Sequence, residues 1–353
     1  MQNKALIDLS RNECPEPPLE LLEVALPRAI AIANLYPVQA LVELRQALAK
    51  HHDVDEEQIL VANGATDLIW LLARWARAAR GAGSEAEVLA PAVSFVAYTQ
   101  ACSSAGVRLR YGPMRADYGI DLDALLQSVS ESTRVVFLAN PNNPTGGIIG
   151  NDEFSEFMAR IPASVLVVID EAYRIFSDEA ARIHSAELQK RYANLLVLHT
   201  FSKSFGIAGL RLGYAIGTAS LLAQIERHSG PFSVNMVALV AAQLLLGHPD
   251  FAENAARKNN ERRSYVTYAL TQLGLRVLPS QGNFMSILVP GQAKELADTL
   301  LSYGIRGRTL DDYGLPDGFR ITVGNELQNA ALISALQKIK QSNKLNSIFT
   351  NSQ

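Results

Sequence analysis

The chain has 353 residues, 48% of them hydrophobic, so it can bury a large core and form more than one domain. Its net charge of -3 and the absence of a basic stripe or a long apolar run argue against nucleic acid or a membrane as a partner. The two cysteines and six histidines lack disulfide or metal-ligand spacing, so we expect a cytoplasmic protein without a metal ion.

Short apolar runs alternate with helical patterns through the middle of the chain. The predicted strands are Ile59–Asn63, Glu87–Ala90, Val107–Tyr111, Val135–Ala139, Val165–Asp170, Leu195–Thr200 and Leu212–Gly217. The predicted helices are Thr66–Arg80, Phe95–Ser104, Asp121–Val129, Asp152–Ile161, Ser220–His228 and Asn235–Gly247. Because most of these strands are apolar throughout, they indicate a mostly parallel seven-stranded sheet covered by helices on both faces.

A different pattern follows the long charged helix predicted over Pro249–Leu273. It has short strands at Arg276–Leu278, Phe284–Val289, Gly304–Arg308 and Phe319–Val323, and helices at Gln292–Tyr303 and Glu326–Ser342. This pattern predicts a smaller α+β domain. We therefore expect an N-terminal arm over residues 1–35, a large α/β domain over 36–248 and a small domain over 249–353.

The turn at Asn63-Gly64-Ala65-Thr66-Asp67 joins a strand to a helix. The backbone N–H groups of Ala65 and Thr66 open that helix and are free to bind an anion. A capping role for Thr66 or Asp67 uses the same geometry and is compatible with it.

Two aromatic residues near the start of the next predicted helix are candidates for stacking on a ligand. Either Phe95 or Tyr98 could stack on a planar ring, although an aromatic residue on a helix more often belongs to the core.

Asn143 follows one apolar strand, in Asn143-Pro144-Thr145-Gly146, and Asp170 ends the next. In open α/β sheets ligands bind at the carboxyl ends of the strands. A buried Asp170 needs a cation, and a protonated pyridine nitrogen suits it, while Tyr173 could donate to that ring's phenolic oxygen.

The most informative segment runs from Thr200 to Tyr214, after a buried strand. Its Lys203 lies in an apolar, glycine-rich loop, where loss of water should lower the pKa and make the amine a nucleophile. Such an amine forms Schiff bases, including with pyridoxal phosphate. Thr200, Ser202 and Arg211 could hold a phosphate nearby. Taken alone, Lys203 could equally be an ordinary solvated lysine.

Together these motifs resemble the fold-type-I pyridoxal-phosphate aminotransferases. The motifs are Asn143–Gly146, Asp170–Tyr173, Ser202–Tyr214 and Arg320–Gly324. The histidinol-phosphate aminotransferases look most similar, on the basis of Asn12-Glu13, Tyr36-Pro37, Pro231–Asn235 and Gly304–Arg308. The resemblance covers approximately Leu6 to Lys340. It implies a homodimeric transaminase that moves an amino group between an L-amino acid, or a histidinol-phosphate-like amine, and a 2-oxo acid.

The resemblance also implies roles for individual residues. Lys203 would form the aldimine with pyridoxal 5′-phosphate and move the proton, Asp170 would pair with the pyridine nitrogen, and Asn143 and Tyr173 would bind the ring's phenolic oxygen. Tyr98 aligns with the stacking aromatic residue. The implied phosphate ligands are the N–H groups of Ala65 and Thr66, Thr200, Ser202, Arg211 and, from the neighbouring subunit, Tyr36.

The substrate side of the site is less determined. Arg320 would bind the α-carboxylate, and Asn12 lies beside the site. Arg11 and Arg308 could together recognise a distal phosphate or carboxylate, or they could be rim charges in structural ion pairs. The main rival reaction is decarboxylation of a phosphorylated amino acid on the same scaffold. A ligand-sensing regulatory protein is a further alternative, but the matching motifs begin within the first residues, so we expect no DNA-binding domain before them.

Overall fold

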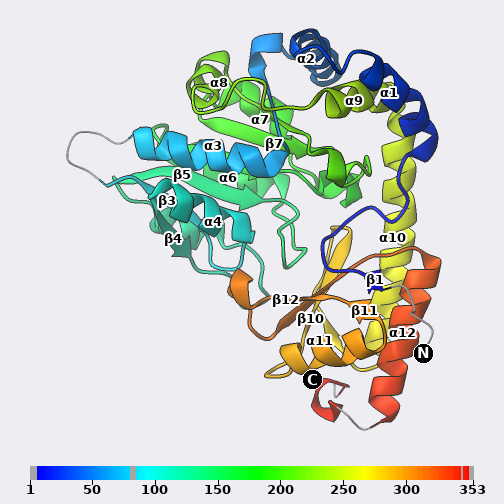
Figure 1. Cartoon of the computed structure of the whole chain (residues 1–353). Helices are drawn as coiled ribbons and strands as arrows, with labels where there is room; N and C mark the ends of the chain where they lie inside the picture. Colours follow the sequence, from blue (N-terminus) through cyan, green and yellow to red (C-terminus); the bar gives the residue numbers. More distant parts are fainter. Residues whose placement is uncertain (1–5, 80–84, 343–344, 350–353) are drawn as a thin grey trace.

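The computed structural model describes residues 6–79, 85–342 and 345–349, and it has two sheet-containing units joined by a long helix (Figure 1). The larger unit contains a seven-stranded sheet in the order β2-β8-β7-β6-β5-β3-β4. The strands are β2 (Ile59–Ala62), β3 (Glu87–Pro91), β4 (Arg108–Gly112), β5 (Thr133–Ala139), β6 (Leu166–Asp170), β7 (Leu195–Thr200) and β8 (Gly213–Ile216). Six of these strands run in one direction and β8 runs antiparallel to them, which confirms the predicted mostly parallel sheet.

Helices cover both faces of this sheet, because its strands bury apolar side chains on both sides. One face packs against α3 (Ala65–Ala78), α4 (Val96–Ala105) and α8 (Ala219–Glu226). The other face packs against α2 (Val38–His52), α5 (Leu122–Gln127), α6 (Asn151–Arg160), α7 (Ser185–Arg191) and α9 (Met236–Leu246). Along β5, for example, Phe137 belongs to the first cluster and Leu138 to the second. This alternation also determines that Asp170 lies on the α3 and α4 side.

The smaller unit follows α10 (Pro249–Gln272). Its antiparallel sheet has the order β12-β13-β10-β9, and α11 and α12 pack against it. The bounds are β9 (Arg276–Val277), β10 (Phe284–Leu288), α11 (Ala293–Ser302), β12 (Arg308–Thr309), β13 (Gly318–Thr322) and α12 (Glu326–Gln341).

The strand predicted over Gly304–Arg308 is two short strands in two different sheets. β11 (Ile305–Arg306) pairs with β1 (Ile7–Asp8), whereas β12 pairs with β13. Gly307 separates them, and a Cβ atom there would lie 2.3 Å from the Phe319 ring. The chain therefore changes sheets at a position where a larger residue would clash with the core.

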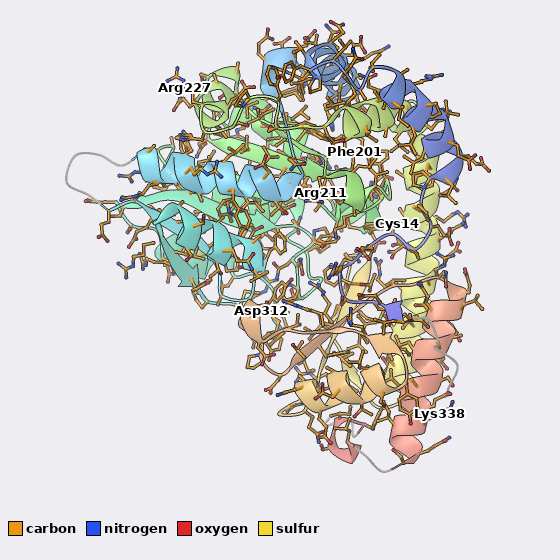
Figure 2. All side chains as sticks on the ribbon, viewed as in Figure 1. Cys14, Phe201, Arg211, Arg227, Asp312 and Lys338 are labelled. Atoms are coloured by element: carbon orange, nitrogen blue, oxygen red, sulfur yellow. The ribbon has the colours of Figure 1, made fainter. Side chains whose placement is uncertain are left out.

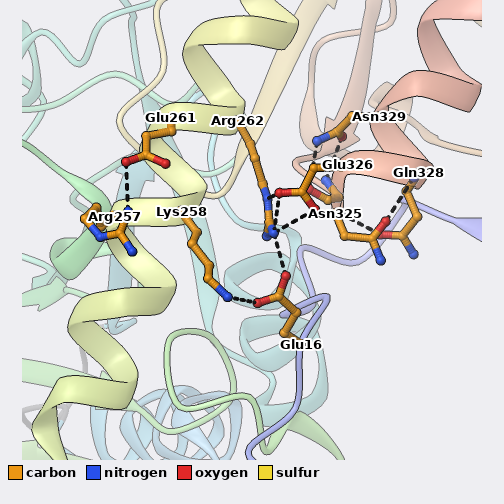
Figure 3. A network of polar contacts seen from close by, with 10 residues as sticks. Glu16, Arg257, Lys258, Glu261, Arg262, Asn325, Glu326, Gln328 and Asn329 are labelled. Carbon is orange, nitrogen blue, oxygen red and sulfur yellow. Dashed lines mark hydrogen bonds and ion pairs between the residues drawn. The ribbon is translucent and has the colours of Figure 1, made fainter.

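The N-terminal arm runs from β1 to α1 (Leu19–Ala31) and then to α2 (Figure 1). Both helices pack on α9, and neither is among the predicted elements. Glu16 holds the arm to α10, because its carboxylate accepts from Lys258 Nζ at 2.7 Å and from Arg262 Nη2 at 2.5 Å (Figure 3). Arg262 also bonds Glu326 at the start of α12, so this network links the arm to the smaller unit.

In the described part of the chain no helix is both long and apolar enough to cross a membrane. The same part of the chain contains no cluster of metal-ligating side chains.

Candidate active site

A cavity of about 640 Å³ lies where the carboxyl ends of β5, β6 and β7 meet the arm and the smaller unit. Its walls include thirteen of the predicted site residues, namely Arg11, Asn12, Ala65, Thr66, Asn143, Asp170, Tyr173, Thr200, Ser202, Lys203, Arg211, Arg308 and Arg320. A larger cavity, about 840 Å³, lies on the other side of the arm against α10, and it contains neither Lys203 nor Asp170. The smaller cavity is therefore the candidate site.

Lys203 sits at the base of this cavity with its amine bound to the arm. Nζ donates to the backbone oxygens of Arg11 at 3.1 Å and Asn12 at 3.0 Å. Burial, and next the positive charge of Arg320, lower the pKa of Lys203 to about 7. At neutral pH a large fraction of this lysine is therefore the free amine, as its sequence context predicts.

Asp170 is the last residue of β6 and is only 5% exposed. Oδ1 accepts from the N–H group of Ala172 at 3.0 Å. Burial raises the pKa of this carboxyl to about 6, against a smaller opposing effect of that hydrogen bond. An ionised carboxylate in such surroundings is stabilised by a cation brought into the cavity beside it.

Asn143 and Tyr173 belong to one network with Arg320. Nδ2 of Asn143 and Nδ2 of Asn12 donate to the Tyr173 hydroxyl at 3.4 and 3.1 Å. Arg320 Nη1 donates to Asn143 Oδ1 and, at 3.3 Å, to the Tyr313 hydroxyl. The Tyr173 oxygen accepts twice, so its own proton remains available to donate into the cavity.

The start of α3 and the loop after β7 lie close together at the cavity. Gly64 has φ of 89°, and a Cβ atom there would lie 2.5 Å from Arg211 Nη2. A Cβ atom on Gly213 would lie 2.4 Å from the Ala65 nitrogen. Both glycines therefore let Arg211 and the helix start come close together. Arg211 Nη1 donates to Ser202 Oγ at 3.3 Å, which holds the guanidinium beside the helix N-terminus.

Residues 4–336 match the family model for aminotransferase class I and II. This chain is a class I and II aminotransferase. It is 35% identical over 334 residues to a histidinol-phosphate aminotransferase of Akkermansia muciniphila, covering 95% of this chain and 90% of that protein.

Two solved structures are also similar. The histidinol-phosphate aminotransferase of Sinorhizobium meliloti in complex with pyridoxal-5′-phosphate has a TM-score of 0.88 at 25% identity, covering 96% of this chain and 92% of that one. An L-threonine-O-3-phosphate decarboxylase of Porphyromonas gingivalis has a TM-score of 0.82 at 27% identity, covering 95% and 100%. The family model and the histidinol-phosphate relatives support transamination, and the decarboxylase alternative has less support.

The cofactor of this aminotransferase is pyridoxal 5′-phosphate. The cavity residues fit that group on independent grounds. The raised pKa of Asp170 shows a buried carboxyl that suits a cationic ring nitrogen. The glycine-lined approach of Arg211 to the helix start suits a phosphate. Lys203 supplies an amine with a pKa of about 7 in the same cavity.

Tyr98 does not lie at the cavity, so its predicted stacking role is wrong. Its ring is fully buried and stacks on Phe137, with centroids 4.6 Å apart. Phe95, the alternative, lines the cavity instead. The helix begins at Val96, so Phe95 keeps an extended backbone and faces the site, whereas Tyr98 turns toward the sheet.

Tyr36 also lies outside the cavity of its own chain. It is 74% exposed, and its ring stacks on Phe232 with centroids 4.4 Å apart. This position agrees with the expectation that Tyr36 serves a neighbouring subunit, which stays a prediction.

The more exposed part of the cavity, here called its outer end, is lined by Arg11, Glu13, Arg306 and Arg308, which is more charged residues than predicted. Arg308 is ion-paired with Asp312, whereas the Arg11 side chain makes no ion pair with another described residue. Arg306 and Glu13 also line this end and are not among the predicted site residues. The Arg306 side chain is half-exposed, and nothing in the sequence distinguishes it from an ordinary surface arginine.

Proposed function

We propose that this aminotransferase transfers the α-amino group of an L-amino acid to a 2-oxo acid, with Lys203 as the lysine that binds the cofactor and carries the proton. The single observation that supports this assignment most strongly is that the Lys203 amine and the buried Asp170 carboxyl line one cavity, where burial lowers the pKa of Lys203 to about 7. An amine with that pKa can both accept and donate a proton at neutral pH.

The other residues then have defined roles. When bound, pyridoxal phosphate supplies an electron sink for the negative charge that develops at the substrate Cα. Asp170 stabilises a positive charge on the ring nitrogen, and Tyr173 and Asn143 bind the phenolic oxygen. The N–H groups of Ala65 and Thr66 bind the phosphate together with Thr200, Ser202 and Arg211. Phe95 stacks on the ring.

Arg320 binds the α-carboxylate of the amino donor. It is 3% exposed, its Nη2 donates to the Ser10 carbonyl at 2.9 Å, and its Nε has no partner among the described residues. The guanidinium is thus held rigidly while part of its donor capacity is unused, which suits a carboxylate clamp. Asn12 positions both Tyr173 and Lys203, because its side chain donates to the Tyr173 hydroxyl and its carbonyl accepts from Lys203 Nζ.

We propose further that the enzyme is a homodimer in which Tyr36 reaches the partner's cofactor phosphate. Apolar side chains are exposed on and around α1 and α2, among them Leu19, Ile30, Leu35, Tyr36 and Val38. A patch of this kind favours association. In this scheme residues 1–35 form the arm, 36–248 the large domain and 249–353 the small domain. Analytical ultracentrifugation should give a dimer mass, and a fully active monomer would contradict the proposal.

A cytoplasmic location completes the proposal. It is supported by two unpaired cysteines, Cys14 and Cys102, which suit a reducing compartment. Cell fractionation tests it, and recovery in a membrane or secreted fraction would contradict it.

One screen tests the reaction. The purified, cofactor-loaded protein is mixed with single amino acids and with histidinol phosphate, the substrate in the relatives' names. Transamination predicts loss of the visible cofactor absorbance together with formation of a 2-oxo product. Release of carbon dioxide without an oxo product would instead favour the decarboxylase. An L-amino acid should be a donor, and a protein inert to all of them would refute the proposal.

A further inference from the structure

Opposite charges balance at the outer end of the cavity. The three arginines that line it are Arg11, Arg306 and Arg308. Three carboxylates lie among them, since Glu13 also lines the cavity, Asp312 pairs with Arg308, and Asp8 pairs with Arg306 at 3.2 Å. This end of the cavity therefore has little surplus positive charge for an anion.

The Asp312 carboxylate is held in place by a short turn that belongs to the site. The turn η5 (Asp311–Tyr313) has a buried Tyr313, which packs with Leu310 and Leu315 against Val93 of the larger unit. Tyr313 is followed by Gly314 with φ of 79°, where a Cβ atom would lie 2.8 Å from the Ala92 oxygen. Asp312 thus occupies the junction of the two units, where Figure 2 labels it.

Arg308 and Arg320 both lie close to the Tyr313 ring. The ring centroid lies 5.8 Å from the Arg308 guanidinium carbon and 5.3 Å from that of Arg320. Both arginines lie near the same ring, and Asp312, the residue before Tyr313, neutralises Arg308. An anionic group that extends beyond Arg320 therefore meets an arginine that already has a carboxylate partner.

We infer that Asp312 is a specificity-determining residue that makes the site favour amino acids, with one carboxylate at Arg320, over amines that carry a phosphate ester. The inference rests on the proposed function. Histidinol phosphate carries a phosphate ester at the carbon position that is the carboxylate in L-histidine, so its phosphate is longer and more highly charged than a carboxylate at Arg320, and Arg308 is the next arginine on the Tyr313 ring. Asp312 repels that dianion and competes for its arginine, whereas it has little effect on a monoanionic carboxylate at Arg320.

The experiment compares L-histidine with histidinol phosphate, because the two share the imidazole side chain. The ratio of kcat/KM for histidinol phosphate to kcat/KM for L-histidine is measured for the wild type and Asp312→Asn, together with the Kd of histidinol phosphate by calorimetry. Removing one unit charge beside a dianion at a half-exposed site should raise this ratio about tenfold and lower that Kd similarly. Added salt should shrink the difference.

A matched control is Asp311→Asn on the same turn. Asp311 is exposed, and its side chain makes no ion pair with another described residue, so this variant should leave the ratio unchanged. An unchanged ratio and Kd in Asp312→Asn, or an equal rise in Asp311→Asn, would overturn the inference. Failure of the proposed function is distinguishable, because the wild type would then convert none of the L-amino acids in the screen.

Discussion

The inner and outer ends of the cavity use charge in opposite ways. The inner end holds Lys203, Asp170 and Arg320 in buried surroundings, and burial moves the pKa of Lys203 down to about 7 and that of Asp170 up to about 6. At the outer end Arg306 and Arg308 are half-exposed and paired with carboxylates. Groups with altered proton affinity suit catalysis, whereas exposed pairs contribute little stability and suit selection among substrates.

Replacing Lys203 tests the inner end most severely. Lys203→Ala removes the amine that the proposal requires for cofactor attachment and proton transfer, so kcat should fall by at least about a thousandfold. The visible absorbance of covalently bound cofactor should disappear as well. The exposed Lys190, which pairs with Asp53, offers a matched control, and Lys190→Ala should keep both signals. Full activity in Lys203→Ala would refute the assignment.

The inner end was largely predictable because topology brings it together. Asp170 and Thr200 each end a buried strand, and the parallel strands β6 and β7 lie side by side, so their ends meet at one sheet edge. Asn143 follows β5, the next strand along, by the same logic. The motifs thus predicted where these side chains meet.

The outer end was not predictable from the same pattern. Asp312 lies four residues after Arg308, but only the turn stabilised by buried Tyr313 decides that the two side chains meet. Phe95 and Tyr98 show the same limit on a smaller scale, because the sequence offers both rings and the packing of Tyr98 on Phe137 leaves Phe95 as the ring at the cavity. In each case tertiary packing decides between positions that the sequence leaves equivalent.

The pH dependence of cofactor uptake tests the inner end more finely. The free amine is the reactive form, so the rate at which cofactor-free protein attaches pyridoxal phosphate should rise about tenfold per pH unit below pH 7 and level off above it. Stopped-flow absorbance measures this rate. Arg320→Gln should move the midpoint upward, since the charge of Arg320 is the second cause of the lowered pKa. A wild-type midpoint near the ordinary lysine value of about 10.5 would contradict the altered environment.

Arg11 provides the smallest and most selective test, at the outer end. Its side chain lines the cavity, is exposed and has no ion-pair partner among the described residues, so it is the arginine there with most capacity to attract an anion. Arg11→Ala should lower kcat/KM about two- to fivefold for donors with an anionic side chain, as expected of a single exposed charge. L-Glutamate and L-glutamine, which have nearly the same shape, separate this effect from any change in packing.

The sign of the Arg11 effect is as informative as its size. If the outer end selects substrates by charge balance, removing Arg11 and removing the charge of Asp312 must act in opposite directions on anionic donors, because one residue attracts them and the other repels them. Equal losses for L-glutamate and L-glutamine would make Arg11 structural, acting through the backbone segment whose oxygen accepts from Lys203. A loss confined to L-glutamate would instead show that the exposed end of the cavity discriminates by charge while the buried end performs the chemistry.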